Sequence, residues 1–253
     1  MCRFLLLFIL FLSLLLIPGE FEGAAREKQE VPLITFRKKE DSYARAEERF
    51  SMVENQIKNR GVRDEKVLEA MRKVPRHLFV PSEYQDQAYG DYPLPIGYNQ
   101  TISQPYIVAL MTELLEIKPQ DKILEVGTGS GYQAAILAEL ASEVYSIEIK
   151  EPLAKSAEKI LSELGYNSIK VRAGDGYFGW PEAAPFGGII VTAAPEQVPQ
   201  PLIDQLAEGG RLVVPEGKFF QELVVYQKSG GKTKRREVIP VRFVPMTGEA
   251  EKQ

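Results

Sequence analysis

The sequence predicts an α/β protein with a doubly wound, mostly parallel sheet, a C-terminal antiparallel hairpin and additional N-terminal helices. From residue 103 onward, apolar segments with strand spacing alternate with segments of helix spacing across short connections, which is typical of parallel strands linked by helices. The segment Ile189-Ile190-Val191 is apolar at successive positions, as expected for a strand buried on both faces. Near the end of the chain, two strand-like segments flank Ser-Gly-Gly-Lys at residues 229 to 232, which indicates a hairpin.

The composition is that of a chain with a sizeable apolar core. Of 253 residues, 44% are hydrophobic and 26% are charged, which excludes a disordered or collagen-like chain. The formal net charge of −4 provides no positive surface for a polyphosphate, so we expect no nucleic-acid partner. The only cysteine is Cys2, so the rest of the chain has no thiolate nucleophile. His77 is the only histidine and has no partner at metal-ligand spacing, so we expect no metal site.

The first 25 residues are expected to lie outside the fold. Residues 4 to 17 are apolar apart from Ser13, and Pro18-Gly19 follows them. This stretch is short for a bilayer span, which needs roughly 20 residues, but it fits a secretory signal. We therefore interpret residues 1–25 as a signal peptide or membrane anchor with membrane contact through residues 4–17 only, residues 26–42 as a charged linker, and residues 43–253 as one domain. The alternative is a start at Met52, which opens a helical pattern.

Helices and strands follow from periodicity and stop signals. Gly61 and Pro75 end the first two predicted helices. Residues 81 to 100 are rich in Pro, Gly and Tyr and have no predicted regular structure. We interpret the basic run at residues 232 to 236 as a solvated hairpin tip. The predicted helices span residues 43–60, 64–73, 104–117, 131–141, 152–164 and 199–207, and the predicted strands span residues 122–126, 143–149, 168–172, 187–192, 211–214, 222–227 and 238–244.

A glycine-rich loop follows the first of the alternating strands. Gly127-Thr128-Gly129-Ser130-Gly131 lies between this strand and a predicted helix. Glycines permit positive φ and close backbone approach, and a helix N-terminus presents unpaired N–H groups to a polar or anionic ligand group. Tyr132 occupies the third glycine position of the dinucleotide pattern Gly-x-Gly-x-x-Gly, which disfavours pyrophosphate. The loop also lacks the Gly-Lys-Ser/Thr ending of an NTPase loop. It is therefore expected to bind a nucleotide-type ligand of another kind.

Polar groups at the ends of three further strands are expected to converge on this loop. Glu148 closes the next strand, 23 residues after Glu125, where a carboxylate in a doubly wound sheet accepts hydrogen bonds from ribose hydroxyls. Gly174-Asp175-Gly176 and Thr192-Ala193-Ala194-Pro195 follow the next two strands. Ligands of such sheets gather at the carboxyl ends of the strands. Together these sites predict an adenosine-bearing ligand.

The glycine loop with Glu125 and Glu148 resembles the cofactor site of S-adenosylmethionine-dependent methyltransferases with a seven-stranded Rossmann-like sheet, and the closing hairpin resembles the antiparallel addition of that superfamily. Five further motifs occur in the order found in the protein-L-isoaspartate O-methyltransferase family, so the resemblance covers about residues 50 to 247. These motifs are Pro75-Arg76-His77-Leu78-Phe79-Val80-Pro81, Leu94-Pro95-Ile96-Gly97, Gln100-Thr101-Ile102-Ser103-Gln104-Pro105-Tyr106, Val191-Thr192-Ala193-Ala194-Pro195 and Arg242-Phe243-Val244-Pro245.

The resemblance implies repair methylation: transfer of a methyl group from S-adenosyl-L-methionine to the α-carboxylate of L-isoaspartyl residues in damaged proteins and peptides. It also implies that Ser103 is the catalytic residue beside the acceptor carboxylate. The cofactor contacts implied are Ile96, Gly97, Gln104, Glu125, Gly127, Gly129, Gly131, Glu148, Asp175, Gly176 and Thr247, and the substrate contacts are Thr192, Ala193, Ala194, Val244 and Pro245.

The residues agree with this chemistry. A carboxylate of ordinary pKa is ionised at neutral pH and needs no general base, so the protein has mainly to place it in line with the methyl group, which supplies roughly 7 to 11 kcal/mol. Ser103 is expected to orient the acceptor by a hydrogen bond. By spacing alone, Ser103 also fits an ordinary helix N-cap before Pro105. We interpret His77 as structural and Trp180 as a core residue rather than a base-stacking platform.

Several alternatives stay open from the sequence. An adenine amino methyltransferase is expected to carry Asp/Asn-Pro-Pro-Tyr/Phe where this chain has Thr192-Ala193-Ala194-Pro195, and a cytosine C5 enzyme needs a cysteine. A methyltransferase with another acceptor, or a non-catalytic module that binds S-adenosyl or isoaspartyl ligands, is compatible with the pattern. The cofactor favours the cytoplasm, which we expect, whereas the leader favours a periplasmic or membrane-anchored protein held through residues 1–25.

Overall fold

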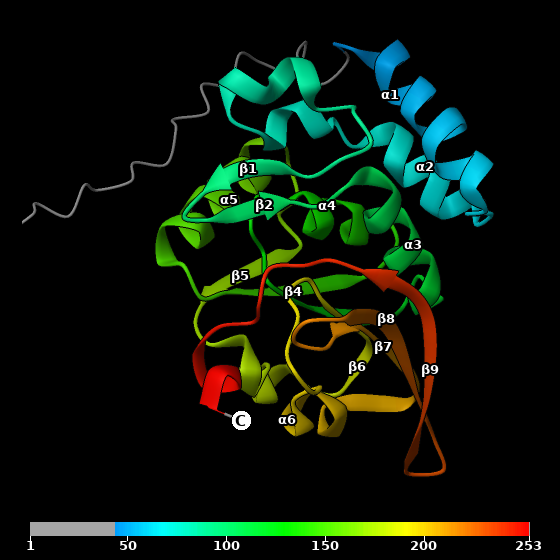
Figure 1. Cartoon of the computed structure of the whole chain (residues 1–253), viewed down its shortest axis with the longest axis vertical. Coiled ribbons are helices and arrows are strands. Elements are labelled where there is room, and N and C mark those ends of the chain that lie inside the picture. Colours follow the sequence, from blue (N-terminus) through cyan, green and yellow to red (C-terminus); the bar gives the residue numbers. More distant parts are fainter. Residues whose placement is uncertain (1–43, 253) are drawn as a thin grey trace, which may run out of the picture.

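The computed structural model describes residues 44–252, so the predicted leader and linker lie outside the described residues. A seven-stranded sheet with the strand order β5-β4-β3-β6-β7-β8-β9 forms the centre of the molecule (Figure 1). The five strands β5, β4, β3, β6 and β7 are parallel, whereas β8 runs antiparallel to β7 and β9 runs antiparallel to β8. This arrangement confirms the predicted fold class. The strands are β3 (Lys122–Val126), β4 (Glu143–Glu148), β5 (Ile169–Ala173), β6 (Phe186–Val191), β7 (Leu206–Glu216), β8 (Gln221–Ser229) and β9 (Lys232–Val241).

Both faces of the sheet are covered, and two apolar cores result. Side chains alternate along a strand, so Ile123 of β3 belongs to the core under the N-terminal helices while its neighbour Leu124 belongs to the opposite core. Helices on the first face contribute residues such as Leu68, Val108 and Leu161. The helices that follow the N-terminal one are α2 (Glu65–Lys73), α3 (Pro105–Leu115), α4 (Tyr132–Ala138), α5 (Glu151–Glu163) and α6 (Gln200–Asp204). On the second face, α6 contributes Leu202, and the C-terminal segment contributes Met246 and Ala250.

The N-terminal helices occur where the sequence predicts them. Helix α1 (Ala46–Met52) continues through a π-helical turn at Val53–Ile57 and a 3₁₀ turn at Lys58–Arg60, and it ends at Gly61 with a φ of 106°. Helix α2 begins after Asp64, whose carboxylate accepts a hydrogen bond from the backbone N–H of Lys66 at 2.9 Å, a standard N-cap. Among the described residues, none of the helices is both long enough and apolar enough to cross a bilayer.

The stretch without predicted structure contains a small second sheet. Strands β1 (Leu94–Gly97) and β2 (Gln100–Ile102) form an antiparallel pair. The two residues between them, Tyr98 and Asn99, have φ values of 52° and 57°. A two-residue hairpin turn needs positive φ at both central positions and usually signals itself by Asn-Gly. Tyr-Asn gives no such signal, which is why the sequence does not reveal this hairpin.

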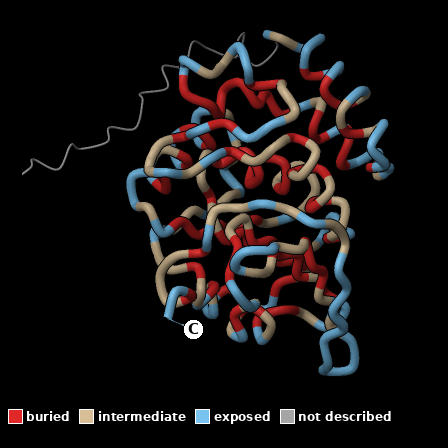
Figure 2. The backbone as a smooth tube through the Cα atoms, viewed as in Figure 1, coloured by how far each residue is buried: buried red, intermediate tan, exposed pale blue. Residues whose placement is uncertain are grey.

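The last hairpin is longer than predicted. Strand β9 starts at Lys232, where Ser229 is its partner, so only Gly230-Gly231 forms the turn. The basic run at residues 232 to 236 is therefore strand and not a hairpin tip, although all five residues are exposed, as Figure 2 shows for this projecting end. Strand β7 starts at Leu206 rather than at residue 211, and α6 is correspondingly shorter than the predicted helix.

Candidate functional site

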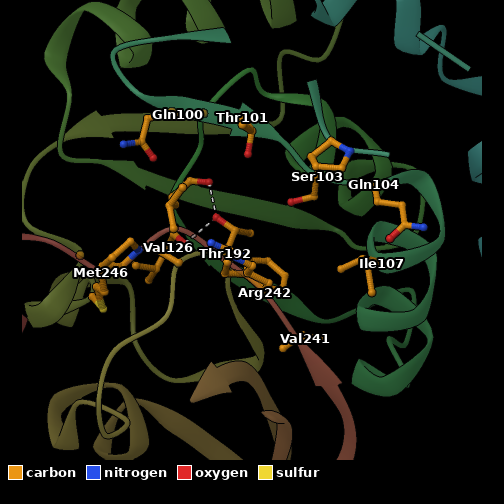
Figure 3. Close-up of a pocket in the computed structure, with 18 of the residues that line it drawn as sticks. Gln100, Thr101, Ser103, Gln104, Ile107, Val126, Thr192, Val241, Arg242 and Met246 are labelled. Carbon is orange, nitrogen blue, oxygen red and sulfur yellow. Dashed lines mark hydrogen bonds between the residues drawn. The ribbon is translucent and has the colours of Figure 1, made fainter. Parts of the chain in front are cut away.

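A pocket of about 860 Å³ lies at the carboxyl ends of the parallel strands (Figure 3). Its floor comes from the ends of β3, β4 and β6, including Gly127, Glu148 and Thr192. The opposite walls come from residues 100 to 107, before and within α3, and from residues 239 to 247, at the end of β9 and directly after it. This is the position where doubly wound sheets bind ligands, and the volume suits a ligand of nucleoside size.

The glycine loop is built so that its backbone approaches both the pocket and β6. Gly127 has a φ of 101°, and a Cβ atom on it would lie 2.2 Å from Thr192 Oγ1. The hydroxyl of Thr192 shares its one proton between the carbonyl oxygens of Gly127 at 2.7 Å and Val126 at 3.1 Å, which are the dashed lines in Figure 3. Both the backbone angle and the available space therefore require glycine at position 127.

Glu148 is fixed at the pocket floor by the same loop. Its Oε2 accepts the backbone N–H of Gly129 at 2.8 Å, and its Oε1 accepts the N–H of Lys150 at 2.9 Å. The side chain is almost fully buried, and this burial raises the pKa of the carboxyl above its ordinary value. Each oxygen has a further lone pair for a hydroxyl donor. Glu148 thus provides the acceptor that a ribose needs.

Ser103 lies on the wall across from this floor. Figure 3 shows its side chain directed into the pocket, close to Gln104. The N-cap position of α3 is Gln104, without a side-chain cap bond, so the interpretation of Ser103 as an ordinary N-cap is wrong. One cavity therefore holds both the glycine loop with Glu148 and a serine hydroxyl on the facing wall.

Comparison with known proteins identifies the family. The model of the family "Protein-L-isoaspartate(D-aspartate) O-methyltransferase (PCMT)" matches residues 47–251. This chain belongs to the protein-L-isoaspartate O-methyltransferase family. A protein-L-isoaspartate O-methyltransferase of Gloeobacter violaceus is 58% identical over 200 residues, which cover 78% of this chain and 98% of the relative. Protein-L-isoaspartate O-methyltransferase 2 of Shewanella sediminis is 56% identical over 214 residues, which cover 84% of this chain and 87% of the relative.

Solved structures of this family have the same fold. One protein-L-isoaspartate O-methyltransferase superposes with a TM-score of 0.74 at 28% identity and covers 81% of this chain and 67% of its own. A putative member from Plasmodium falciparum, solved in complex with S-adenosyl-L-homocysteine, has a TM-score of 0.70 at 27% identity and covers 79% of this chain and 98% of its own. The predicted Rossmann-like methyltransferase fold, the S-adenosylmethionine dependence and the isoaspartyl repair activity are confirmed at the level of this family.

Most of the site residues that the isoaspartyl methyltransferase resemblance implies lie on the pocket wall. Those on the wall are Ser103, Gln104, Gly127, Gly129, Glu148, Gly176, Thr192, Ala193, Val244, Pro245 and Thr247. The other implied residues are not on this wall. Ile96 supports the loop, because a Cβ on Gly129 would lie 3.3 Å from Ile96 Cδ1. Gly97 ends β1, Gly131 precedes α4, and Ala194 forms a bridge with Pro245 that joins the two substrate segments.

Glu125 lies beneath the glycine loop rather than on the pocket wall. It is fully buried, its Oε2 accepts a hydrogen bond from the Ser146 hydroxyl, and its Oε1 has no hydrogen-bond partner among the described residues. Burial raises the pKa of Glu125 to about 8, an effect that the bond from Ser146 opposes and the nearby Glu148 increases. The Ser146 hydroxyl is 2.5 Å from that of Thr128, so Glu125 supports the loop through a chain of hydrogen bonds.

Asp175 connects the end of β5 to the C-terminal segment. Its Oδ1 accepts the backbone N–H of Tyr177 at 2.9 Å, and its Oδ2 accepts that of Glu249 at 2.8 Å. The second bond holds the segment that carries Thr247, which is on the pocket wall. A Cβ on Gly176 would lie 2.3 Å from Val126 Cγ1, so the chain passes close to β3 here. Asp175 is thus placed to shape the pocket from behind.

Two residues interpreted as structural have the expected surroundings. His77 is buried, and its Nδ1 lies 2.7 Å from the hydroxyl of Tyr89. Trp180 packs against Tyr145 in the second core, with ring centroids 5.0 Å apart. Arg60, in contrast, is a pocket residue that the sequence does not reveal. A basic residue in the last turn of a helix is ordinarily explained by the helix dipole, so nothing marks it as part of a site.

Proposed function

We propose that this chain transfers the methyl group of S-adenosyl-L-methionine to the α-carboxylate of L-isoaspartyl residues in damaged proteins and peptides, with Ser103 as the residue that orients the acceptor. The observation that carries the proposal is the position of the Gly127–Glu148 floor and the Ser103 wall on opposite sides of one pocket. The donor therefore belongs on the side of Gly127 and Glu148, and the acceptor belongs on the side of Ser103.

The floor suits the nucleoside part of the cofactor. Backbone comes close at Gly127 and Gly176, where a Cβ would collide with Thr192 and Val126, and Glu148 has acceptor capacity for ribose hydroxyls. When bound, the cofactor supplies a sulfonium-activated methyl group. We assign the cofactor to Gly127, Gly129, Glu148, Gly176 and the neighbouring wall residues Gln104 and Thr247. Ile96, Glu125 and Asp175 support this wall from behind, and Gly97 and Gly131 belong to the turns at the end of β1 and before α4.

The acceptor requires placement rather than activation. Its carboxylate is ionised at neutral pH, so a carboxylate oxygen attacks the methyl carbon while the carbon–sulfur bond breaks and its electron pair stays on sulfur. The products are a methyl ester and S-adenosylhomocysteine. A hydrogen bond from the Ser103 hydroxyl to the second carboxylate oxygen holds the attacking oxygen in line. Thr192, Ala193, Val244 and Pro245 line the remaining acceptor side, with Ala194 behind them.

Selectivity for L-isoaspartyl residues follows from the same placement. The isoaspartyl α-carboxylate is one methylene nearer to the backbone than the side-chain carboxylate of aspartate. Because in-line transfer is sensitive to displacements of about 1 Å, a pocket that fits one carboxylate places the other outside reacting distance.

Replacing Ser103 with alanine tests this assignment. We expect kcat to fall at least about tenfold, which corresponds to the roughly 1.5 to 3 kcal/mol of a hydrogen bond to a charged group, while the affinity for S-adenosylhomocysteine changes less than about twofold. Ser142→Ala, which removes a hydroxyl bonded to the carbonyls of Gln120 and Asp121 outside the pocket, is the matched control. Unchanged turnover in Ser103→Ala would remove Ser103 from the mechanism.

We also infer that residues 43–253 form the methyltransferase domain and that it works in the cytoplasm, where its cofactor is made. The match of the family model to residues 47–251 supports the domain boundary. A periplasmic or membrane-anchored protein, with contact through residues 4–17, is the alternative. Mass spectrometry of the N-terminus in fractionated cells distinguishes the two, because cleavage near Ala25 would show export.

A further inference from the structure

Arg76 is a fully buried arginine that connects three segments around the pocket. Its Nε donates a hydrogen bond to the carbonyl of Ala88 at 2.7 Å, and its Nη2 donates to the carbonyl of Ser103 at 2.8 Å. Its guanidinium carbon lies 5.0 Å from the ring centroid of Tyr132, the first residue of α4 after the glycine loop. One side chain therefore contacts both Ser103, the residue proposed to orient the acceptor, and the helix that follows the cofactor loop.

The surroundings of Arg76 are unusual for a residue that only packs. No carboxylate of the described residues lies within 4.0 Å of its guanidinium, and its Nη1 is buried without a hydrogen-bond partner among them. A buried cation without a carboxylate is costly, and burial lowers the pKa of Arg76 to about 10, which still leaves it charged at neutral pH. Among the described residues, the guanidinium of Arg76 donates hydrogen bonds only to backbone carbonyls, so its effect is on the positions of these carbonyls.

We propose that Arg76 is a positioning residue for methyl transfer, whose guanidinium fixes the backbone of Ser103 relative to the glycine loop through Tyr132. The inference rests on the proposed role of Ser103 as the acceptor-orienting residue. A planar guanidinium holds two carbonyls at fixed directions at the same time, whereas a lysine ammonium is a single point on a flexible stem. Since a displacement of about 1 Å can cost a hundredfold in rate, fixing Ser103 across the pocket from the donor has a direct effect on turnover.

The test compares the same substitution at two buried arginines. Arg76→Lys keeps the charge and the aliphatic stem but loses the rigid fork. Arg49→Lys makes the same change at a buried arginine of α1 that donates to the carbonyl of Arg72 and the hydroxyl of Tyr89, neither of which lines the pocket. Both variants are expected to lower the melting temperature. Only Arg76→Lys is expected to lower kcat, by about tenfold with KM for the peptide changed less than threefold, whereas Arg49→Lys retains kcat within twofold.

A double-mutant cycle separates positioning from a merely structural role. If Arg76 acts through Ser103, Arg76→Lys in a Ser103→Ala background has kcat within twofold of Ser103→Ala alone. A tenfold further loss in that background, or a folded Arg76→Lys variant with kcat within twofold of the wild type, would overturn the proposal. If Ser103→Ala itself leaves kcat unchanged, the assignment of Ser103 fails instead, so the two failures are distinguishable. Circular dichroism at the assay temperature establishes that each variant is folded before its kcat is measured.

Discussion

Replacing Glu125 with glutamine is expected to change how stability depends on pH. Glu125 is fully buried beneath the glycine loop, and burial raises its pKa from the ordinary 4.5 to about 8. Between these values the folded protein keeps a proton that the unfolded chain has released. The contribution of Glu125 to stability is therefore fully present below about pH 4.5 and is lost as the pH rises toward 8. The loss amounts to about 1 kcal/mol per pH unit for one group.

Urea denaturation at pH 5, 6, 7 and 8 measures this effect. Glutamine has nearly the same shape and can still accept the hydrogen bond of Ser146, but it cannot ionise. The free energy of unfolding of the wild type is expected to fall, relative to that of Glu125→Gln, by about 1 kcal/mol for each pH unit in this range. Glu158→Gln on the exposed face of α5 is the control and is expected to leave the wild-type dependence unchanged. A difference between wild type and Glu125→Gln that does not vary with pH would refute the reasoning.

Three further substitutions test the pocket floor and the segment behind it. Glu148→Gln places an amide N–H against a backbone N–H of Gly129 or Lys150 and removes a charged acceptor. Calorimetry should therefore show about 10- to 100-fold weaker binding of S-adenosylhomocysteine. An unchanged affinity would contradict the assignment of Glu148 to the ribose. Gly127→Ala forces a side chain into positive φ and onto Thr192 Oγ1, so denaturation should show a loss of about 1 to 3 kcal/mol or more, and full stability would mean that the loop relaxes freely. Asp175→Ala leaves two backbone N–H groups without their acceptor. The free energy of unfolding should therefore fall by about 1 to 3 kcal/mol, and calorimetry should show weaker binding of S-adenosylhomocysteine. If the variant binds it as tightly as the wild type, the C-terminal segment does not shape the site.

The periodic part of the sequence predicts the fold well because its signals are local. The strands and helices from Pro105 to Val191 are found within about three residues of their predicted ends, since apolar spacing, glycines and prolines act over a few residues. The β1–β2 hairpin escapes prediction because Tyr98 and Asn99 adopt positive φ without the usual glycine. The extension of β9 through five exposed basic and polar residues escapes it for another reason. An edge strand that is open to solvent does not need apolar residues.

The site residues also fall into two groups, those that a local motif predicts and those whose place only the structure shows. Gly127, Glu148 and Ser103 belong to motifs and are found on the pocket wall. Glu125 belongs to the same motif, yet only the structure shows that it faces the core beneath the loop. Which face of a strand a carboxylate occupies depends on the packing of helices on the sheet. The bonds of Arg76 to Ala88 and Ser103 join residues distant in sequence, so no local pattern predicts them.

The most direct test of the account is methyl transfer to a pair of peptides that differ only in one linkage. The purified chain, supplied with S-adenosyl-L-methionine carrying a labelled methyl group, is expected to label an L-isoaspartyl peptide and to leave its aspartyl twin at background. The label on the isoaspartyl peptide should be released by mild base, as expected for a methyl ester. Equal labelling of both peptides, or labelling of neither, would contradict the account.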